Sequence, residues 1–138
     1  MSTDEQRLPG VVRRMSVVVD ASLVLAWLQD EAGSDEAEPL LMEGLIGAAN
    51  WSEVLQKARQ HGARAGLVAR LLASFGLQVV EVTSDDAQRA AELWRPGTSL
   101  SLADRLCLAL GLRLRLDVAT ADGAWRDIDG GPPVILIR

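Results

Sequence analysis

Cysteine and histidine are almost absent from this sequence. Cys107 is the only cysteine, which excludes an internal disulfide framework and a cysteine-based zinc knuckle. His61 is the only histidine, so histidine-rich zinc sites are excluded as well. We expect Cys107 to be a small buried residue of a helix and His61 a polar residue at a helix end. Any metal chemistry must therefore depend on oxygen ligands.

Long apolar runs are also missing. Charged residues interrupt the richest stretch, residues 100–119, so no run reaches the roughly 18 residues that cross a bilayer. We therefore expect no membrane partner. The first residues include acids and have no apolar segment behind them, which predicts no secretory signal and a cytoplasmic location. A glycine-rich phosphate loop ending in Gly-Lys-Ser or Gly-Lys-Thr is absent too, so nucleotide triphosphate hydrolysis has no support.

Positive charge is scarce. The formal net charge of the 138 residues is −5, so any attraction to nucleic acid must come from a local patch. A hydrophobic fraction of 49% with 24% charged residues is typical of a globular chain, and the length suits one domain. Residues 1–14 contain Pro9-Gly10 and show no periodicity, so we expect a flexible extension followed by a single domain over residues 15–138.

The hydrophobic patterning predicts short strands alternating with pairs of helices. Compact β-branched or alternating runs indicate strands near residues 16–20, 45–49, 78–83, 117–120 and 134–137. Apolar stripes of helical period indicate helices near residues 22–28, 36–44, 51–61, 63–74, 84–94 and 101–112. Ser22 is the expected cap of the first helix, and Asn50 is expected to end the second strand. This order predicts an α/β fold of three layers, α/β/α, with a mainly parallel sheet of about five strands.

Four acids lie where the predicted strands hand over to helices. Asp20 closes the first strand, and Glu53 follows the second. Asp104 lies in the first turn of the long helix, and Asp122 comes just after the fourth strand. Ligands gather outside the carboxyl ends of parallel strands, so these four acids are the candidate site. Converging carboxylates repel one another unless a cation shares them, and oxygen ligands without histidine or cysteine favour Mg²⁺ or Mn²⁺. Such an ion activates water and polarises phosphoryl oxygens, which predicts phosphodiester hydrolysis.

The same acids lie in segments that resemble the motifs of PIN-domain nucleases. Four blocks carry the resemblance: Val18 to Ser22, Asn50 to Val54, Leu100 to Leu110, and Ala119 to Trp125. The likeness is greatest to the VapC-type toxins of bacterial toxin–antitoxin modules and runs from Met15 to Arg138. It implies a PIN-like fold and an endoribonuclease that depends on Mg²⁺ or Mn²⁺ and is usually dimeric. It also implies that a cognate antitoxin, a separate chain, holds the enzyme inactive by inserting a tail into the acidic groove.

The resemblance also implies roles for individual residues. Asp20 and Asp104 match metal ligands, Glu53 a ligand or the group that orients the attacking water, and Asp122 a ligand directly or through water. Three further residues match donors that support these acids: Thr120, Ser22 and Asn50. Arg105 is expected to contact a substrate phosphate or an antitoxin carboxylate, and Trp51 and Trp125 to stack on a base. We expect the antitoxin to contact an apolar groove around Trp27, Leu28, Leu41 and Leu45.

Two other functions stay open on the sequence. A non-catalytic PIN-like module would hold RNA or a protein without cutting, although such a module is expected to lose at least one of the four acids. A receiver-like signalling domain is also an acidic α/β module that binds Mg²⁺. It needs a lysine late in the chain to contact a phosphoryl group, and Lys57, the single lysine, comes too early. The target RNA, the antitoxin and the number of metal ions cannot be read from the sequence.

Overall fold

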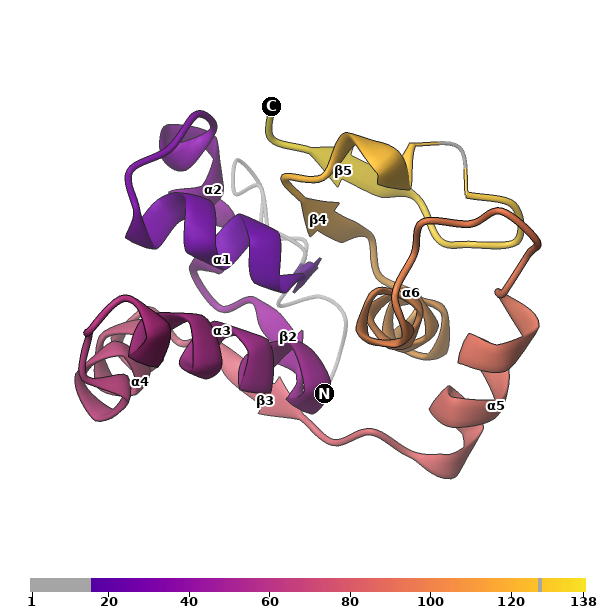
Figure 1. The fold of residues 1–138 in the computed structure, drawn as a ribbon, viewed down its shortest axis with the longest axis horizontal. Coiled ribbons are helices and arrows are strands. Elements are labelled where there is room, and N and C mark those ends of the chain that lie inside the picture. Colours follow the sequence, from indigo (N-terminus) through magenta and orange to yellow (C-terminus); the bar gives the residue numbers. More distant parts are fainter. Residues whose placement is uncertain (1–15, 127) are drawn as a thin grey trace, which may run out of the picture.

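Strands and helices alternate along the chain in the predicted order (Figure 1). The structure is a computed structural model that describes residues 16–126 and 128–138, so the predicted extension at residues 1–14 lies outside the described residues. The elements are β1 (Val18–Val19), α1 (Ala21–Leu28), α2 (Ser34–Leu41), β2 (Leu45–Gly47), α3 (Ala48–Gln60), α4 (Ala65–Ser74), β3 (Gln78–Val80), α5 (Ser84–Glu92), α6 (Leu102–Leu114), β4 (Val118–Thr120), the short 3-10 helix η2 (Gly123–Trp125) and β5 (Val134–Leu136).

The five strands form one sheet in the order β3-β2-β1-β4-β5, and every neighbouring pair is parallel. Helical crossovers between consecutive strands make a parallel arrangement possible, because parallel strands cannot be joined by a tight turn. The chain builds outward from β1 to β3 and then returns to β4 on the other side of β1. A topological switch point therefore lies between β1 and β4, and the predicted α/β/α fold with a parallel sheet is confirmed.

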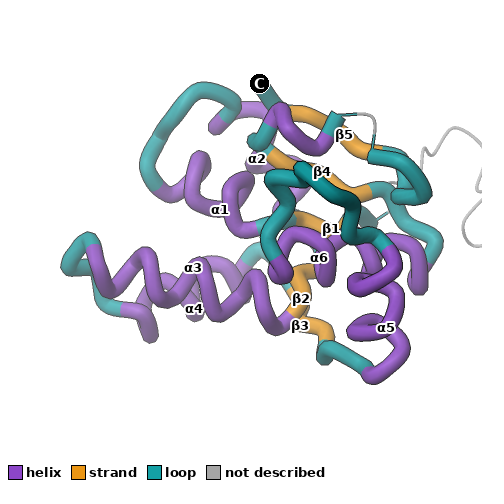
Figure 2. The backbone as a smooth tube through the Cα atoms, turned by 45° about the vertical axis from the view of Figure 1, so that its right-hand side comes forward, coloured by secondary structure: helices purple, strands orange, loops and turns teal. Residues whose placement is uncertain are grey.

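The sheet separates two hydrophobic cores. Val19 belongs to the core that α1 to α4 cover, whereas Val18 faces the core that contains buried side chains of α6. This alternation follows from the strand period of two, and both residues are fully buried because β1 is the central strand. Figure 2 shows the strands running between α1 to α4 on one side and α5 and α6 on the other. Among the described residues, no helix has both the length and the apolar content to cross a membrane.

Two predicted element boundaries are wrong, and both matter for the site. The cap of α1 is Asp20 instead of Ser22, because the Asp20 carboxylate accepts a hydrogen bond from the backbone N–H of Leu23 at 3.0 Å. Helix α3 begins at Ala48, so Asn50 lies in its first turn instead of ending β2. Strand β2 has three residues and stops at Gly47, which is the residue before the helix. In both helices the polar side chain, Ser22 or Asn50, therefore lies inside the first turn instead of before it.

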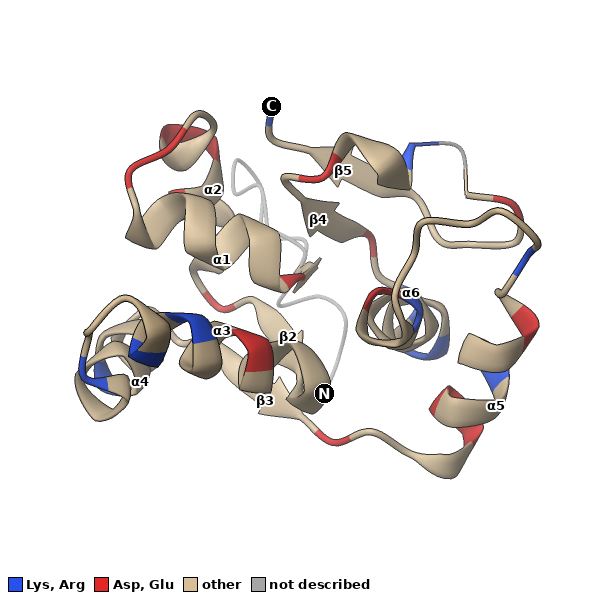
Figure 3. Ribbon diagram, viewed as in Figure 1, with Lys and Arg blue, Asp and Glu red and all other residues tan. Residues whose placement is uncertain are grey.

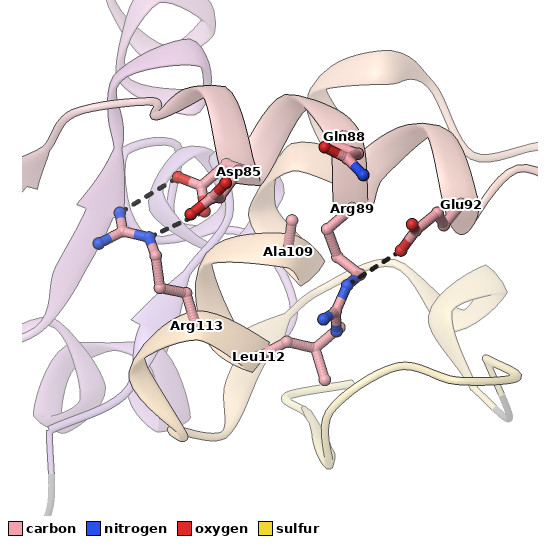
Figure 4. A pocket seen from close by; sticks show the side chains of 8 residues that line it. Asp85, Gln88, Arg89, Glu92, Ala109, Leu112 and Arg113 are labelled. Carbon is pink, nitrogen blue, oxygen red and sulfur yellow. Dashed lines mark hydrogen bonds and ion pairs between the residues drawn. The ribbon is translucent and has the colours of Figure 1, made fainter.

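Helices α5 and α6 are held together by a buried ion pair. Asp86 is 3% exposed, and its two carboxylate oxygens accept hydrogen bonds from Arg113 at 2.8 and 3.1 Å. Burial raises the pKa of Asp86, but the hydrogen bonds from Arg113 and from the backbone of Thr83 outweigh it, so the net pKa is lowered. A hollow of about 320 Å³ lies between these helices, with Arg113 at one end and the Arg89–Glu92 pair at the other (Figure 4). Its charged side chains largely neutralise one another.

Candidate active site

The predicted site residues lie around the carboxyl ends of β1, β2 and β4. Asp20 directly follows β1, Asn50 and Glu53 lie in α3 just after β2, and Thr120 ends β4. These three strands are neighbours in the order β2-β1-β4. The site therefore lies at the switch point of the sheet, where the chain leaves space beyond the strand ends. Asp104 reaches the same region from the first turn of α6.

Asp20 is a buried carboxylate held by hydroxyl groups. Asp20 is 3% exposed, and Thr120 Oγ1 donates a hydrogen bond to Asp20 Oδ2 at 2.6 Å. Ser22 Oγ lies 2.9 Å from both carboxylate oxygens and 3.1 Å from Thr120 Oγ1. The backbone N–H of Ala121 donates to Ser22 Oγ at 3.0 Å, which fixes this hydroxyl between β1 and β4. Ser22 and Thr120 thus contact Asp20 directly, and their roles in supporting it as a metal ligand stay a prediction.

Burial dominates the electrostatics of Asp20. Desolvation raises its pKa from 3.8 to about 6, against the opposing effect of hydrogen bonds from Thr120, Leu23 and Ser22. The negative charge of Asp104 raises the pKa of Asp20 further, so these carboxylates lie within electrostatic range of each other. Among the described residues no lysine or arginine forms a salt bridge with Asp20. A cation is the group that this environment would favour.

Glu53 is positioned by Asn50. The Asn50 side chain is buried, and its Nδ2 donates to Glu53 Oε1 and to the backbone carbonyl of Ala103, both at 3.3 Å. One amide group therefore links α3 to the start of α6. Burial raises the pKa of Glu53, and the charge of Asp104 raises it too, while Asn50 and Lys57 lower it. The oxygen Oδ1 of Asn50 is a buried atom with no partner among the described residues.

Asp104 has a structural role as well as a place near the other acids. It forms a capping box with Ser101, in which Asp104 Oδ2 accepts from the Ser101 N–H at 2.9 Å and Ser101 Oγ accepts from the Asp104 N–H at 3.1 Å. The Asp104 carboxylate is half-buried and acts electrostatically on Asp20, Glu53 and Cys107. Burial is the main cause that raises the pKa of the Cys107 thiol, and the charges of Asp20, Asp104 and Glu53 raise it further, so the thiol stays protonated.

Asp122 lies at the rim instead of inside the cluster. Its side chain is exposed and caps η2 by accepting a hydrogen bond from the Ala124 N–H at 2.9 Å. Its backbone N–H donates to Thr120 Oγ1 at 3.0 Å, so it is connected to Asp20 through that hydroxyl. The structure thus brings Asp104 within electrostatic range of both Asp20 and Glu53, whereas the Asp122 carboxylate faces solvent.

Two of the three residues predicted to contact substrate are used in internal packing instead. Trp125 is 0% exposed inside the second core, so the prediction that it stacks on a base is wrong in this structure. Arg105 Nη1 donates to the backbone carbonyl of Ala90 at 2.8 Å, near the end of α5, which directs its guanidinium to packing between helices. Trp51 remains half-buried on α3. The sequence could not separate these tryptophans, because both lie beside acids and helix starts.

The predicted antitoxin groove is only partly available at the surface. Leu41 is 0% exposed and belongs to the first core, so its inclusion in a surface groove is wrong. Trp27 packs edge-on against Phe75 with ring centroids 5.1 Å apart, and its indole N–H donates to Glu38. Leu28 and Leu45 are half-buried. Apolar periodicity identified these residues correctly as packed, but it could not separate core from surface.

Arg138 contacts the edge of the site from the far end of the chain, a position that sequence reasoning missed. Its Nε donates to the carbonyl of Ala121 at 3.2 Å, in the segment between Thr120 and Asp122. Its Nη1 lies 3.4 Å from Glu31 Oε1 and donates to the carbonyl of Ala32 at 3.2 Å. Arg138 thus ties the loop after β4 to the loop after α1. No local pattern predicts a contact across more than a hundred residues.

The donor set fits a hard divalent ion that keeps part of its water shell. Carboxylate, hydroxyl and amide oxygens surround the end of β1, with Asp20 desolvated and Asn50 Oδ1 lacking a partner. Within residues 16–126 and 128–138, no three acidic, histidine or cysteine side chains are close enough to ligate one ion together. Mg²⁺ commonly uses one or two carboxylates and completes its shell with water, which agrees with this spacing.

Comparisons with known proteins agree with this geometry. The model of the PIN domain family matches residues 17–131. No curated protein sequence matches the chain. The chain is similar to a solved toxin–antitoxin complex from Klebsiella pneumoniae, with a TM-score of 0.70 and 22% identity over 89% of this chain and 98% of that one.

Two further solved structures have the same fold. VapC20 from Mycobacterium tuberculosis, described as a toxin that cleaves the sarcin-ricin loop, has a TM-score of 0.64 and 19% identity, with 78% of this chain and 91% of that chain covered. DNA-bound VapBC from Salmonella typhimurium has a TM-score of 0.67 and 17% identity, with 91% and 100% covered. At these identities the likeness concerns the fold.

Proposed function

The chain belongs to the PIN domain family, and from that premise we propose that it is a metal-dependent endoribonuclease, the toxin of a toxin–antitoxin pair. The observation that carries the proposal is the electrostatic convergence of Asp20, Glu53 and Asp104 at the switch point of the sheet. The RNA-cleaving toxin of Mycobacterium tuberculosis, similar in fold, supports the substrate class. The family match gives no support to a receiver-like signalling domain.

Mg²⁺ or Mn²⁺ is the proposed cofactor. Asp20 and Asp104 would hold the ion, while Glu53 would orient water or, like Asp122, reach the ion through bound water, because no three of these acids are close enough to ligate one ion in the described residues. When bound, such an ion lowers the pKa of a water molecule and neutralises charge on the phosphoryl group. It would also offset the cost of keeping Asp20 ionised in a buried position, since the raised pKa of Asp20 reflects desolvation.

The protein's own side chains orient and transfer protons in this proposal. Hydrolysis of a phosphodiester bond joins a water oxygen to phosphorus, breaks one P–O ester bond, takes one proton from the attacking water and returns one proton to the leaving oxygen. Glu53 is suited to accept that proton or to orient the water, because its pKa is raised mainly by burial and Asn50 fixes its carboxylate. Ser22 and Thr120 hold Asp20 in one orientation by donating to its oxygens.

A cognate antitoxin, RNA and a second copy of the chain are the proposed partners. Solved neighbours from Klebsiella pneumoniae and Salmonella typhimurium are described as toxin–antitoxin or VapBC complexes, which supports an antitoxin on a separate chain. We propose that the antitoxin covers the acidic site and also contacts the half-buried side chains of Trp27 and Leu28 on α1, whereas Leu45 packs against the second core at the amino end of β2. The homodimer is proposed from family resemblance.

Cleavage of total RNA by the purified protein tests the proposed function. Wild type with Mg²⁺ or Mn²⁺ is expected to produce discrete fragments, and EDTA is expected to abolish them. Asp20→Asn and Asp104→Asn should each lower the cleavage rate by about a hundredfold or more, because each removes a charge that holds the ion. Asp35→Asn, an exposed acid on α2, is the matched control and should cleave normally.

The contrary outcome is equally specific. If folded, metal-loaded wild type, freed of any partner that purifies with it, leaves RNA intact, the proposal fails. The chain would then be a non-catalytic PIN-like module that holds RNA or a protein. Circular dichroism and thermal unfolding of each variant separate a lost site from a lost fold.

A further inference from the structure

A groove of about 560 Å³ follows one face of α3, beside the acidic cluster. The lining residues recur at helical spacing and are Ala48, Trp51, Ser52, Leu55, Gln56, Arg59 and Gln60. Because each of these residues has another member of the set three or four positions away, the side chains form one continuous stripe along the helix. The stripe is distinct from the buried face of α3, where Val54 and Ala58 enter the core.

The chemistry of the lining suits an unpaired nucleotide strand. Trp51 is half-buried, so part of its indole ring is accessible in the groove, next to half-buried Leu55. Gln56 and Gln60 add exposed amide groups that can donate to and accept from base edges. Arg59 is exposed and carries the positive charge of the groove. An aromatic ring with a neighbouring cation is the usual combination for binding single-stranded nucleic acid.

The charge around the groove contrasts with the rest of the molecule. The whole chain has a net charge of −5, yet no acid occurs between Glu53 and Glu81, while four cations do: Lys57, Arg59, Arg64 and Arg70. All four are exposed, and Figure 3 shows them gathered over α3 and α4. Within the described part of the chain, the three arginines form no salt bridge, unlike Arg89 and Arg113 near the other hollow.

The groove lies on the same helix as Glu53 of the acidic cluster. Ser52 lines the groove and Glu53 is the next residue. Arg59 lies six residues further on, about 9 Å along the helix axis. The acids repel phosphate, so a substrate strand needs cations near them to hold its backbone. Arg59 and its exposed neighbours are placed to supply that attraction.

We propose that the α3 groove binds single-stranded RNA beside the acidic cluster, with Trp51 stacking on a base and Arg59 contacting a phosphate. The inference rests on the proposed function for its choice of RNA. An acidic protein tail is the competing occupant, but it gives no reason for the accessible indole ring and the paired amides. RNA accounts for the aromatic, amide and cationic groups together.

Fluorescence anisotropy of a labelled 12-nucleotide single-stranded RNA, recorded in EDTA across several salt concentrations, tests the groove without cleavage. Arg59→Gln should weaken binding by about three- to tenfold and lower the slope of log affinity against log salt by about 0.7, which corresponds to one lost phosphate contact. Trp51→Leu should weaken binding by about tenfold, and Trp51→Phe should restore most of it. Arg89→Gln, an exposed arginine on α5, is the matched control.

Several outcomes would contradict the proposal that the α3 groove binds RNA. RNA affinity unchanged in both Arg59→Gln and Trp51→Leu would do so, as would equal losses in Arg89→Gln. Binding of a 12-residue glutamate peptide that depends on Arg59, with no such dependence for RNA, would assign the groove to a protein tail. Cleavage of RNA by wild type with Mn²⁺, measured in parallel, separates the two proposals. If the protein cleaves RNA but binding does not depend on the groove residues, only the proposal of groove binding fails. If binding depends on the groove residues but no cleavage occurs, only the proposed nuclease activity fails.

Discussion

At the scale of single residues, Asp20 shows how a fold can prepare a cation site. Three donors, Ser22, Leu23 and Thr120, hold its carboxylate, yet burial still raises its pKa to about 6. Neutral hydrogen bonds stabilise the anion less than water did, so the charge remains costly in the metal-free protein. The free energy of unfolding of the metal-free protein should therefore include the cost of burying the ionised Asp20, a cost that a bound cation would lower.

Asp20→Asn is expected to stabilise the metal-free protein at pH 8. Between pH 3.8 and about 6 the folded protein retains the Asp20 proton while the unfolded chain loses it, so the free energy of unfolding falls as pH rises through that window. Above it, the ionised Asp20 costs the fold about 3 kcal/mol, which the amide avoids. Urea unfolding in EDTA at pH 8 and pH 3.5 measures the difference.

At pH 3.5 the advantage of Asp20→Asn should disappear, because wild-type Asp20 is then protonated in both states. Asp35→Asn, on the exposed side of α2, should change stability little at pH 8. A variant Asp20→Asn that is less stable than wild type at pH 8 would show that the hydrogen bonds of the carboxylate outweigh its desolvation.

At the scale of elements, α6 positions Asp104 by packing unusually close to the sheet. Gly111 lies in the middle of α6, where glycine costs about 1 kcal/mol relative to alanine in an isolated helix. A Cβ atom at this position would lie 2.5 Å from Val118 Cγ2 and 3.2 Å from the Leu116 carbonyl oxygen. The glycine is thus explained by the close approach of α6 to β4, which helix propensity cannot anticipate.

Gly111→Ala should lower the free energy of unfolding by about 1–3 kcal/mol, despite the higher helix propensity of alanine. The stiff valine side chain and the backbone oxygen cannot both move away without shifting α6 against β4. Thermal and urea unfolding measure the loss. Gly66→Ala in α4, where a Cβ would meet no atom within 4 Å, is the matched control and should be neutral or stabilising. Equal effects at both glycines would contradict this account of the packing.

At the scale of the whole molecule, charge is divided between an acidic site and a cationic stripe on neighbouring surfaces. The charge of Asp104 raises the pKa of Asp20 and of Glu53, and all three acids raise the pKa of Cys107, while the cations of α3 and α4 are exposed. A ligand that binds the folded chain alone raises its stability by mass action. Divalent metal should therefore stabilise the whole domain, and not merely the loops around the site.

Mn²⁺ at about a hundred times its dissociation constant should raise the melting temperature of wild type by on the order of 8 °C. Asp20→Asn should lose most of that rise, although its melting temperature without metal is expected to be higher. Differential scanning fluorimetry with and without EDTA measures both effects. An equal rise in wild type and Asp20→Asn would place the metal elsewhere.

Local chemistry made the fold and most of the candidate site predictable. The β-branched run before Asp20, the helical stripes and the cap residues determine the element order, because each pattern depends on neighbours within one or two turns. The four acids followed from their places at strand ends. The meeting of Asp20 and Thr120 could also be predicted, since parallel strands bring their carboxyl ends to one edge of the sheet.

Tertiary packing decided which of these residues share a site. It buried Trp125 and Leu41, turned Arg105 toward α5 and left Asp122 at the rim. It also brought Arg138 to Ala121 and Asn50 to Ala103, contacts between residues far apart in sequence. Local patterns specify the period and ends of an element, but the direction of each polar side chain depends on which distant element covers it. The direction of these side chains is therefore determined only when the two hydrophobic cores pack against the sheet.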